Sequence, residues 1–412
     1  MADAGRPRPG RGGISRRRAL FGGAALVGGT AAATVWPATG AAAEDADARS
    51  GDDATVGSDT VPFEGVHQAG VVTAAQAFST FAAYDLTVTE PRRVVGLLRI
   101  LTDDIRRMTA GRAALADTAP ELAATPARLT VTLGFGPGLF TTTGLTDRQP
   151  TGLTELPAFP AIDRLDPAWS GGDLLIKISA DDPMIVAHAH RMLHKDTRPF
   201  TRLRWTQRGF LNARGAIAAG ATGRNLMGQL DGTVNPSTDA ELDSRVWAGA
   251  DAGWFAGGTT LVLRRIRMDL DRWDELDPAA MDATIGRRQR DGSPLSGTRE
   301  YDEPDFTVPD ATGLPAIADF AHIKVARGDG PARQILRRPY NYDDTPTADG
   351  GSDSGQIFCS YQADIAAQFV PIQQRLAERD LFNQWTTPIG SAVFAIPPGS
   401  PADGYLGQGL FA

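Results

Sequence analysis

Cysteine is nearly absent from this chain of 412 residues, which contains only Cys359. A single thiol excludes an intramolecular disulfide and cannot by itself build a zinc or iron–sulfur cage. Histidine is scarce too, with five residues, so few imidazoles are available for catalysis or metal binding. Net positive charge is lacking: the formal charge is -8 at pH 7. This balance disfavours nucleic acid as a partner, because the phosphate backbone attracts basic surfaces.

The N-terminal stretch has the pattern of a secretory signal. Scattered arginines lead to SRRRALF at 15–21, an apolar run rich in Gly and Ala follows, and Ala41–Ala43 offers a cleavage site before Glu44. The twin arginines favour the twin-arginine route, whereas a membrane anchor is disfavoured because the run is short and interrupted by proline. We predict a signal at residues 1–43 and no membrane span after its cleavage. The protein would reach a periplasm, a cell wall or the medium with a cofactor already bound.

The remaining chain is long for a single core, which suggests two domains. Residues 44–60 are polar and acidic, and we expect a flexible mature N-terminus there. Small residues at 211–222 mark the expected boundary between an N-terminal domain at 61–215 and a C-terminal domain at 216–412.

Hydrophobic patterning predicts the elements of both domains. Strands are expected at 129–136, 173–181, 202–210, 259–270, 333–342, 356–364 and 391–399. Helical segments are expected at 95–108, 182–193, 272–288 and 366–380. Long strands mixed with helices predict the α+β class.

Four histidines have ordinary interpretations. His188, His190 and His194 share a predicted helix, and the last two are four residues apart on one face. That spacing can bind metal, but no glutamate completes a zinc-protease pattern, so we favour a solvent-exposed helix surface. His67 is expected to form a hydrogen bond from a loop or a strand edge.

His322 lies among apolar residues in IADFAHIKVA at 317–326. An apolar setting disfavours the imidazolium and suits a neutral ligand, although a hydrogen-bonded core histidine is the simpler interpretation. Asp319, three residues earlier, is expected to be a neighbour on a helical turn rather than a partner of the imidazole.

Two more polar residues stand out. Asp231 lies between Gly228 and Gly232 in GQLDGTVNP, a stretch otherwise typical of a turn. Arg337 adjoins Arg338 on a predicted strand, where neighbouring side chains point to opposite faces. One arginine could face solvent, and the other would face inward and need an anion or a carboxylate. A structural salt bridge is the simpler interpretation of that residue.

GQLDGTVNP resembles the GxxDG signature of dye-decolorising peroxidases, and blocks along most of the chain resemble the same family. They are VPFEGVHQAG, similar to an N-terminal strand of the family, then LTVTLGFGPGLF, DLLIKISADDP, TTLVLRRIRMDLDRWD, IGRRQRDGSPL, AHIKVA, LRRPYNY, SYQADIAAQFVPIQQRLAERD and GSAVFAIPPG. The twin-arginine pattern is similar to the exported subfamily that includes the iron-transport-associated deferrochelatase/peroxidases. The resemblance implies two ferredoxin-like domains, each an antiparallel sheet with helices, and one haem b per chain in the C-terminal domain.

The resemblance also implies roles for individual residues. His322 would be the axial ligand of the haem iron, with Asp231 as acid/base and Arg337 as charge stabiliser on the opposite side. Three residues would run along the haem: Gly232, Thr233 and Val234. Relatives often have Asn-Pro-Arg after the axial histidine where this chain has RGDGPAR, so a haem propionate would contact either Arg327 or Arg333.

The implied function is a peroxidase that uses H2O2 to form a ferryl intermediate and oxidises dyes, phenolics or other bulky electron donors. An aspartate titrates at roughly 3.9 and a histidine at roughly 6.5, so a carboxylate base predicts turnover that peaks at acidic pH. Because bulky donors cannot enter a small pocket, oxidation occurs at the haem edge or through surface aromatics. The candidates are Trp385, Tyr361, Tyr340, Tyr342 and Tyr405.

Three other functions stay open at this point. A deferrochelatase would release iron from haem with the porphyrin intact, using the same site. A haem-handling partner protein would show little turnover, which the Asp231 and Arg337 pair disfavours. A haem-free ferredoxin-like binding module is the third, and a homo-oligomer is compatible with all of them.

Overall fold

The computed structural model describes residues 56–328, 334–347 and 350–412. The predicted signal, most of the expected flexible segment and Arg333 lie outside the described residues. Residues 54–412 form one compact unit. The domain boundary expected near residue 216 lies inside this unit and stays a prediction. No helix within the described ranges is long and apolar enough to cross a membrane.

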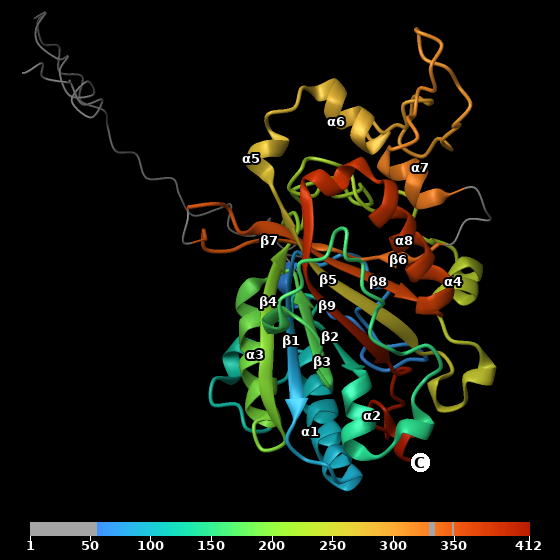
Figure 1. Cartoon of the computed structure of the whole chain (residues 1–412). Coiled ribbons are helices and arrows are strands. Elements are labelled where there is room, and N and C mark those ends of the chain that lie inside the picture. Colours follow the sequence, from blue (N-terminus) through green and yellow to red (C-terminus); the bar gives the residue numbers. More distant parts are fainter. Residues whose placement is uncertain (1–55, 329–333, 348–349) are drawn as a thin grey trace, which may run out of the picture. The chain divides into compact units, whose positions relative to one another are not determined.

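Four antiparallel strands form the sheet of the N-terminal half in the order β2-β3-β1-β4 (Figure 1). They are β1 (Phe78–Leu86), β2 (Thr130–Phe135), β3 (Leu174–Ala180) and β4 (Thr201–Phe210). The helices of this half are α1 (Pro91–Thr109), α2 (Pro137–Thr143) and α3 (Pro183–Thr197). Every residue of β2 and β3 is buried, because helices cover one face of the sheet and the C-terminal half covers the other.

The C-terminal half repeats this arrangement in the order β9-β5-β8-β7. Its strands are β5 (Thr259–Met268), β7 (Tyr340–Asp343), β8 (Ser354–Gln362) and β9 (Thr386–Ile396), and the two-residue β6 (Leu336–Arg337) pairs with β8. In each half the first strand lies between the last and the third. This is the ferredoxin-like α+β arrangement that the sequence predicted.

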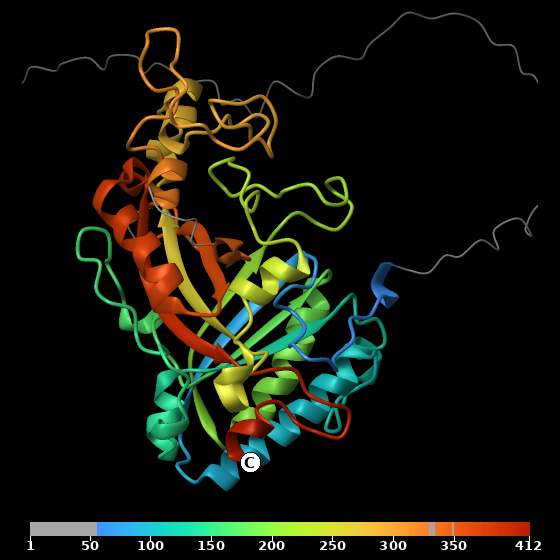
Figure 2. The ribbon, with the colours of Figure 1, turned by 90° about the vertical axis from the view of Figure 1, so that its right-hand side faces the viewer.

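The two sheets join at both edges into one closed sheet. β2 contacts β9 through Phe135 and Ala395, and β4 contacts β7 through Phe210 and Asn341. Because β5 pairs with both β8 and β9, the circuit of strands has no break. Figure 2 shows α1 and α3 on the opposite side of these strands from the red helix α8.

The helices of the C-terminal half are short. They are α4 (Asp239–Arg245), α5 (Leu270–Trp273), α6 (Pro278–Ile285), α7 (His322–Arg327) and α8 (Val370–Arg379). A long irregular segment at 286–321, here called the arm, joins α6 to α7 (orange in Figure 2). The arm lies beside the loop of residues 211–236, which carries Asp231.

Two expectations about elements were wrong. Residues 61–70 contain no strand, and the first strand is β1, which no pattern had indicated. The strand expected at 333–342 is broken into β6 and β7 around Pro339, since proline has no N–H for a ladder. The helix expected at 366–380 is present, with a π-helical turn at Ile365–Phe369 that continues into α8.

The helix α3 is also less exposed than expected. His188 is buried, and its Nε2 lies 2.8 Å from Oδ2 of the buried Asp117. Burial, together with repulsion from His194 and Arg208, lowers the pKa of His190 to about 4. The interpretation of α3 as a solvent-exposed surface was therefore wrong for His188, because its ring is covered by the segment that carries Asp117. His67 behaves as predicted, with Nδ1 2.6 Å from the Gly257 carbonyl oxygen.

Candidate active site

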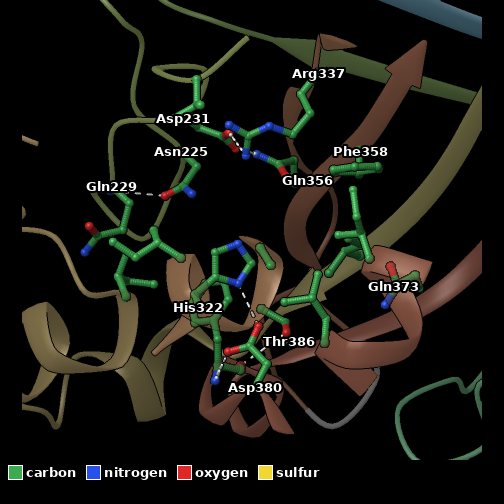
Figure 3. Close-up of a pocket in the computed structure, with 18 of the residues that line it drawn as sticks. Asn225, Gln229, Asp231, His322, Arg337, Gln356, Phe358, Gln373, Asp380 and Thr386 are labelled. Atoms are coloured by element: carbon green, nitrogen blue, oxygen red, sulfur yellow. Dashed lines mark hydrogen bonds and ion pairs between the residues drawn. The ribbon is translucent and has the colours of Figure 1, made fainter. Parts of the chain in front are cut away.

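A cavity of about 300 Å³ lies in the C-terminal half (Figure 3). The loop that carries Asp231 forms one side, and α7 with α8 forms the opposite side. Its walls are largely apolar and include Ile266, Met268, Phe358, Phe369, Ile372 and Leu376, while the N-terminal half contributes Ile162. An apolar cavity with a few convergent polar groups is typical of a site for a small molecule or a cofactor.

Asp231 and Arg337 meet on one side of this cavity (Figure 3). Asp231 Oδ1 lies 3.1 Å from Arg337 Nη1, and Oδ2 accepts a hydrogen bond of 2.9 Å from Gln356 Nε2. The contact at Oδ1 is an ion pair that lacks the alignment of a hydrogen bond. Among the described residues, Oδ1 therefore accepts no hydrogen bond and is free to accept one. The two side chains are only 16% and 28% exposed, and partial burial strengthens their attraction.

The loop around Asp231 requires its glycines. Gly228 has φ +80 and Gly232 has φ +127, conformations that residues with a Cβ rarely adopt. A Cβ on Gly228 would also come within 2.0 Å of Gln289 Nε2. The Asn235 side chain then binds both the N–H and the carbonyl of Arg337, at 2.9 and 2.8 Å. The loop is thereby fixed to β6, and the carboxylate is held beside the guanidinium.

His322 faces this pair from the first position of α7 (Figure 3). Its Nδ1 lies 2.6 Å from Oδ2 of Asp380, a carboxylate only 3% exposed, so Nε2 is the nitrogen that points into the cavity. Burial lowers the pKa of His322, but the Asp380 carboxylate outweighs it and the net shift is upward. Asp380 is fixed in turn, because its Oδ1 accepts a hydrogen bond from the Phe382 N–H at 3.0 Å.

The sequence missed two partners of these residues. Asp380 and Gln356 lie 58 and 125 positions from the residues that they contact, and no local pattern connects them. The sequence predicted that Asp319 is not the partner of His322, and this is confirmed. Its Oδ1 accepts a hydrogen bond from Lys324 at 2.6 Å. Asp319 precedes α7, however, so the expected helical turn does not include it.

The arginines near the cavity are arranged less simply than expected. Arg338 points away from Arg337 and binds the Thr73 carbonyl, but neither side chain faces solvent freely. Arg327 lines the cavity and forms an ion pair with Glu303. Arg287, which the sequence did not single out, also lines the cavity and is buried. Its only signal was its place in the IGRRQRDGSPL block.

The remaining predicted residues take different positions. Thr233 and Val234 line the cavity, whereas Gly232 belongs to the same loop without lining it. One imidazole nitrogen on one side, a carboxylate and a guanidinium opposite, and arginines at the margin fit an iron porphyrin with two propionates. Within the described ranges no group of three or more His, Cys, Asp or Glu residues could hold a bare metal ion.

Comparisons with known proteins identify the family of this chain. The sequence model of the Dyp-type peroxidase N-terminal domain matches residues 68–211, and that of the C-terminal domain matches residues 222–401. This chain belongs to the Dyp-type peroxidase family. It is therefore an oxidoreductase, a haem-dependent peroxidase.

Three relatives illustrate the similarity of this Dyp-type peroxidase to known proteins. It is 39% identical to the dye-decolorizing peroxidase of Thermobifida fusca over 72% of this chain and 70% of that one. It is 33% identical to the deferrochelatase of Yersinia pestis over 96% of this chain and 94% of that one. The crystal structure of a DyP-type peroxidase from Cellulomonas bogoriensis aligns with a TM-score of 0.83 and 49% identity, covering 87% and 99% of the two chains.

Proposed function

We propose that this Dyp-type peroxidase uses hydrogen peroxide to oxidise dyes, phenolics or other bulky electron donors, with Asp231 as acid/base and Arg337 as charge stabiliser. One observation carries the proposal. The Asp231 carboxylate and the Arg337 guanidinium, 3.1 Å apart, face the unpaired nitrogen of His322 across a single cavity. Haem, ligated by His322 Nε2, would supply the iron at which the O–O bond of peroxide is cleaved.

Asp231 is suited to move the proton that this cleavage requires. Its Oδ1 can take a proton from the peroxide oxygen nearer the iron and return it to the oxygen farther from the iron, which then leaves as water. Gln356 occupies Oδ2, which leaves Oδ1 for this exchange. Arg337 offers a positive charge and N–H donors to the developing anion.

The lower side of the site supports His322 as the ligand. Asp380 accepts a hydrogen bond from the Nδ1–H of His322, which leaves Nε2 as the unprotonated, ligating nitrogen. Gly232, Thr233 and Val234 are proposed to lie along the cofactor, supported by the two residues of the three that line the cavity. Arg327 is the proposed propionate contact that the structure describes, and Arg287 joins it as a second cationic residue at the cavity.

Release of iron from haem is the second candidate function, because the chain is 33% identical to proteins named deferrochelatase over most of its length. The same residues would serve it. A haem-handling protein without turnover is disfavoured, since binding alone requires neither Asp231 nor Arg337. Export by the twin-arginine route is also proposed, on the sequence SRRRALF at 15–21.

Product analysis separates the two functions. The purified, haem-loaded protein is incubated with peroxide and an anthraquinone dye at several pH values, and both products are quantified by chromatography. We expect oxidised dye, intact haem and a rate that is highest in acid, where a carboxylate still accepts protons. Free protoporphyrin without oxidised dye would contradict the peroxidase proposal and favour iron release.

A further inference from the structure

Four of the five aromatic residues that the sequence offered for oxidation of bulky donors are buried. Tyr340, Tyr342 and Tyr361 are buried, Trp385 is 8% exposed, and Tyr405 is partly covered. A donor that cannot enter the cavity therefore cannot reach most of them. Among the tyrosines and tryptophans of the described residues, Tyr301 alone is largely exposed, with 68% of its surface accessible to solvent.

Tyr301 lies in the arm, at the place where the arm borders the cavity. Pro304, three residues later, lines the cavity. The preceding residue, Glu300, accepts a hydrogen bond of 2.9 Å from Thr233 and, through its carbonyl, one of 2.7 Å from Arg287. Thr233 and Arg287 are themselves cavity residues. The exposed phenol is thus one residue away from direct contacts with the cavity wall.

A chain of hydrogen bonds leads from the phenol to a carboxylate. The Tyr301 hydroxyl lies 3.3 Å from Thr222 Oγ1. Thr222 Oγ1 donates to Glu300 Oε1 at 2.5 Å. A hydroxyl that accepts one proton while donating another can relay a proton, so Glu300 can receive the phenolic proton without touching Tyr301.

We propose that Tyr301 is the surface residue at which planar aromatic donors too large for the cavity dock and are oxidised, with Glu300 as the store for its proton. The proposal rests on the proposed peroxidase function, because peroxide acting at the haem supplies the oxidising equivalents. An exposed phenol ring offers such donors a face for stacking. The arm then has a role in the reaction besides enclosing the cavity.

The step balances in protons and electrons. Tyr301 would lose one electron, which a bound haem oxidised by peroxide would accept, and its O–H bond would break as the proton passes to Thr222 while the Thr222 proton passes to the Glu300 carboxylate. A neutral tyrosyl radical and a neutral Glu300 carboxylic acid result. A docked donor then gives one electron to Tyr301, and the proton returns from Glu300 through Thr222, which restores both residues.

The test compares four haem-loaded proteins: wild type, Tyr301→Phe, Glu300→Gln and the matched control Tyr405→Phe. Tyr301→Phe keeps the ring and removes only the hydroxyl. Glu300→Gln keeps an oxygen that accepts from Thr222 and Thr233 but cannot store the proton. Each protein receives one equivalent of peroxide without a donor and is frozen for electron paramagnetic resonance. Turnover is measured with a bulky anthraquinone dye and with hydroquinone, a small donor.

We expect a tyrosyl radical signal in wild type and Tyr405→Phe that is lost in Tyr301→Phe and reduced in Glu300→Gln. Tyr301→Phe should lower kcat/KM for the dye about tenfold or more and leave that for hydroquinone unchanged. An unchanged signal and unchanged dye turnover in Tyr301→Phe would overturn the inference while leaving the peroxidase proposal intact. A wild-type protein whose haem spectrum does not respond to peroxide would instead overturn both.

Discussion

At the scale of single residues, the site is built from contacts between distant parts of the chain. His322 and Asp380 show this most clearly, because one hydrogen bond of 2.6 Å decides which imidazole nitrogen faces the cavity. Carboxylates that hold a ligating histidine also raise its basicity as a ligand. Asp380 is therefore a positioning residue for the cofactor as well as the N-terminal cap of the turn at Leu381–Gln384.

Two substitutions of Asp380 separate these effects. Asp380→Asn keeps a capping side chain but removes the negative charge, and Asp380→Ala removes both. We expect Asp380→Asn to raise the reduction potential of the haem iron, measured by spectroelectrochemistry. Asp380→Ala should in addition weaken iron binding or activity by about 10–100-fold. Equal potentials in wild type and Asp380→Asn would show that the carboxylate has no electronic effect on the ligand.

The sequence identified the residues with local signatures and missed their partners. Asp231 stood out through its flanking glycines, and His322 and Arg337 through their unusual settings. The structure brings all three to one cavity. Asp380 and Gln356 had no such signature, because their roles exist only once strands and helices far apart in the sequence have packed together.

At the scale of elements, the loop that carries Asp231 depends on backbone conformation. Gly228 and Gly220 have the same φ of +80, but their surroundings differ. A Cβ on Gly228 meets Gln289, whereas a Cβ on Gly220 finds nothing within 4 Å. Substitution at Gly220 therefore reports backbone strain alone, whereas substitution at Gly228 reports backbone strain together with the steric conflict.

Alanine substitution at both glycines tests this difference. Each substitution should cost about 1–3 kcal/mol of unfolding free energy, because alanine disfavours this φ. Gly228→Ala should cost more than Gly220→Ala and should also slow the reaction with peroxide, since it displaces the turn that holds Asp231. Chemical denaturation and stopped-flow absorbance measure the two effects. A peroxide rate in Gly228→Ala equal to that in Gly220→Ala would contradict this account of the loop.

Hydrophobic patterning predicted most strands but missed β1, in which small and polar residues are buried. β2, β3 and β5 were found because they are rich in β-branched and apolar residues. β1 was missed because small and polar residues fill a strand that is buried on both faces, so neither alternation nor a long apolar run appears. Pro339 was visible in the sequence, yet its effect on the strand depends on the pairing of β6 and β7 with β8.

At the scale of the whole molecule, the closed sheet encloses a lysine between its two halves. Lys177 of β3 is buried and donates hydrogen bonds to the Gly70 carbonyl at 3.0 Å and to the Tyr361 hydroxyl of β8 at 3.2 Å. Burial lowers the pKa of Lys177 from 10.5 to about 8. The Lys177 amine thus links the two halves, but its burial lowers the free energy of unfolding whenever the amine is charged.

This lysine predicts a pH dependence of stability. Because the folded pKa is below the unfolded one, unfolding takes up a proton between about pH 8 and pH 10.5, and stability rises with pH across that window. The penalty, about 3 kcal/mol, is fully present below pH 8. Lys177→Met should flatten this slope relative to wild type in denaturant unfolding, whereas the exposed control Lys195→Met should not. Identical slopes in wild type and Lys177→Met would contradict the prediction.

The central claim is that Asp231 moves the proton during reaction with peroxide at a haem held by His322. Stopped-flow absorbance tests it most directly, with one equivalent of peroxide added to haem-loaded wild type, Asp231→Ala and Arg337→Ala. The Soret band of wild type should change rapidly, and Asp231→Ala should slow this change by about 10²–10⁴-fold, the range for loss of an acid/base. A Soret band that responds to peroxide equally fast in Asp231→Ala and wild type would contradict the account.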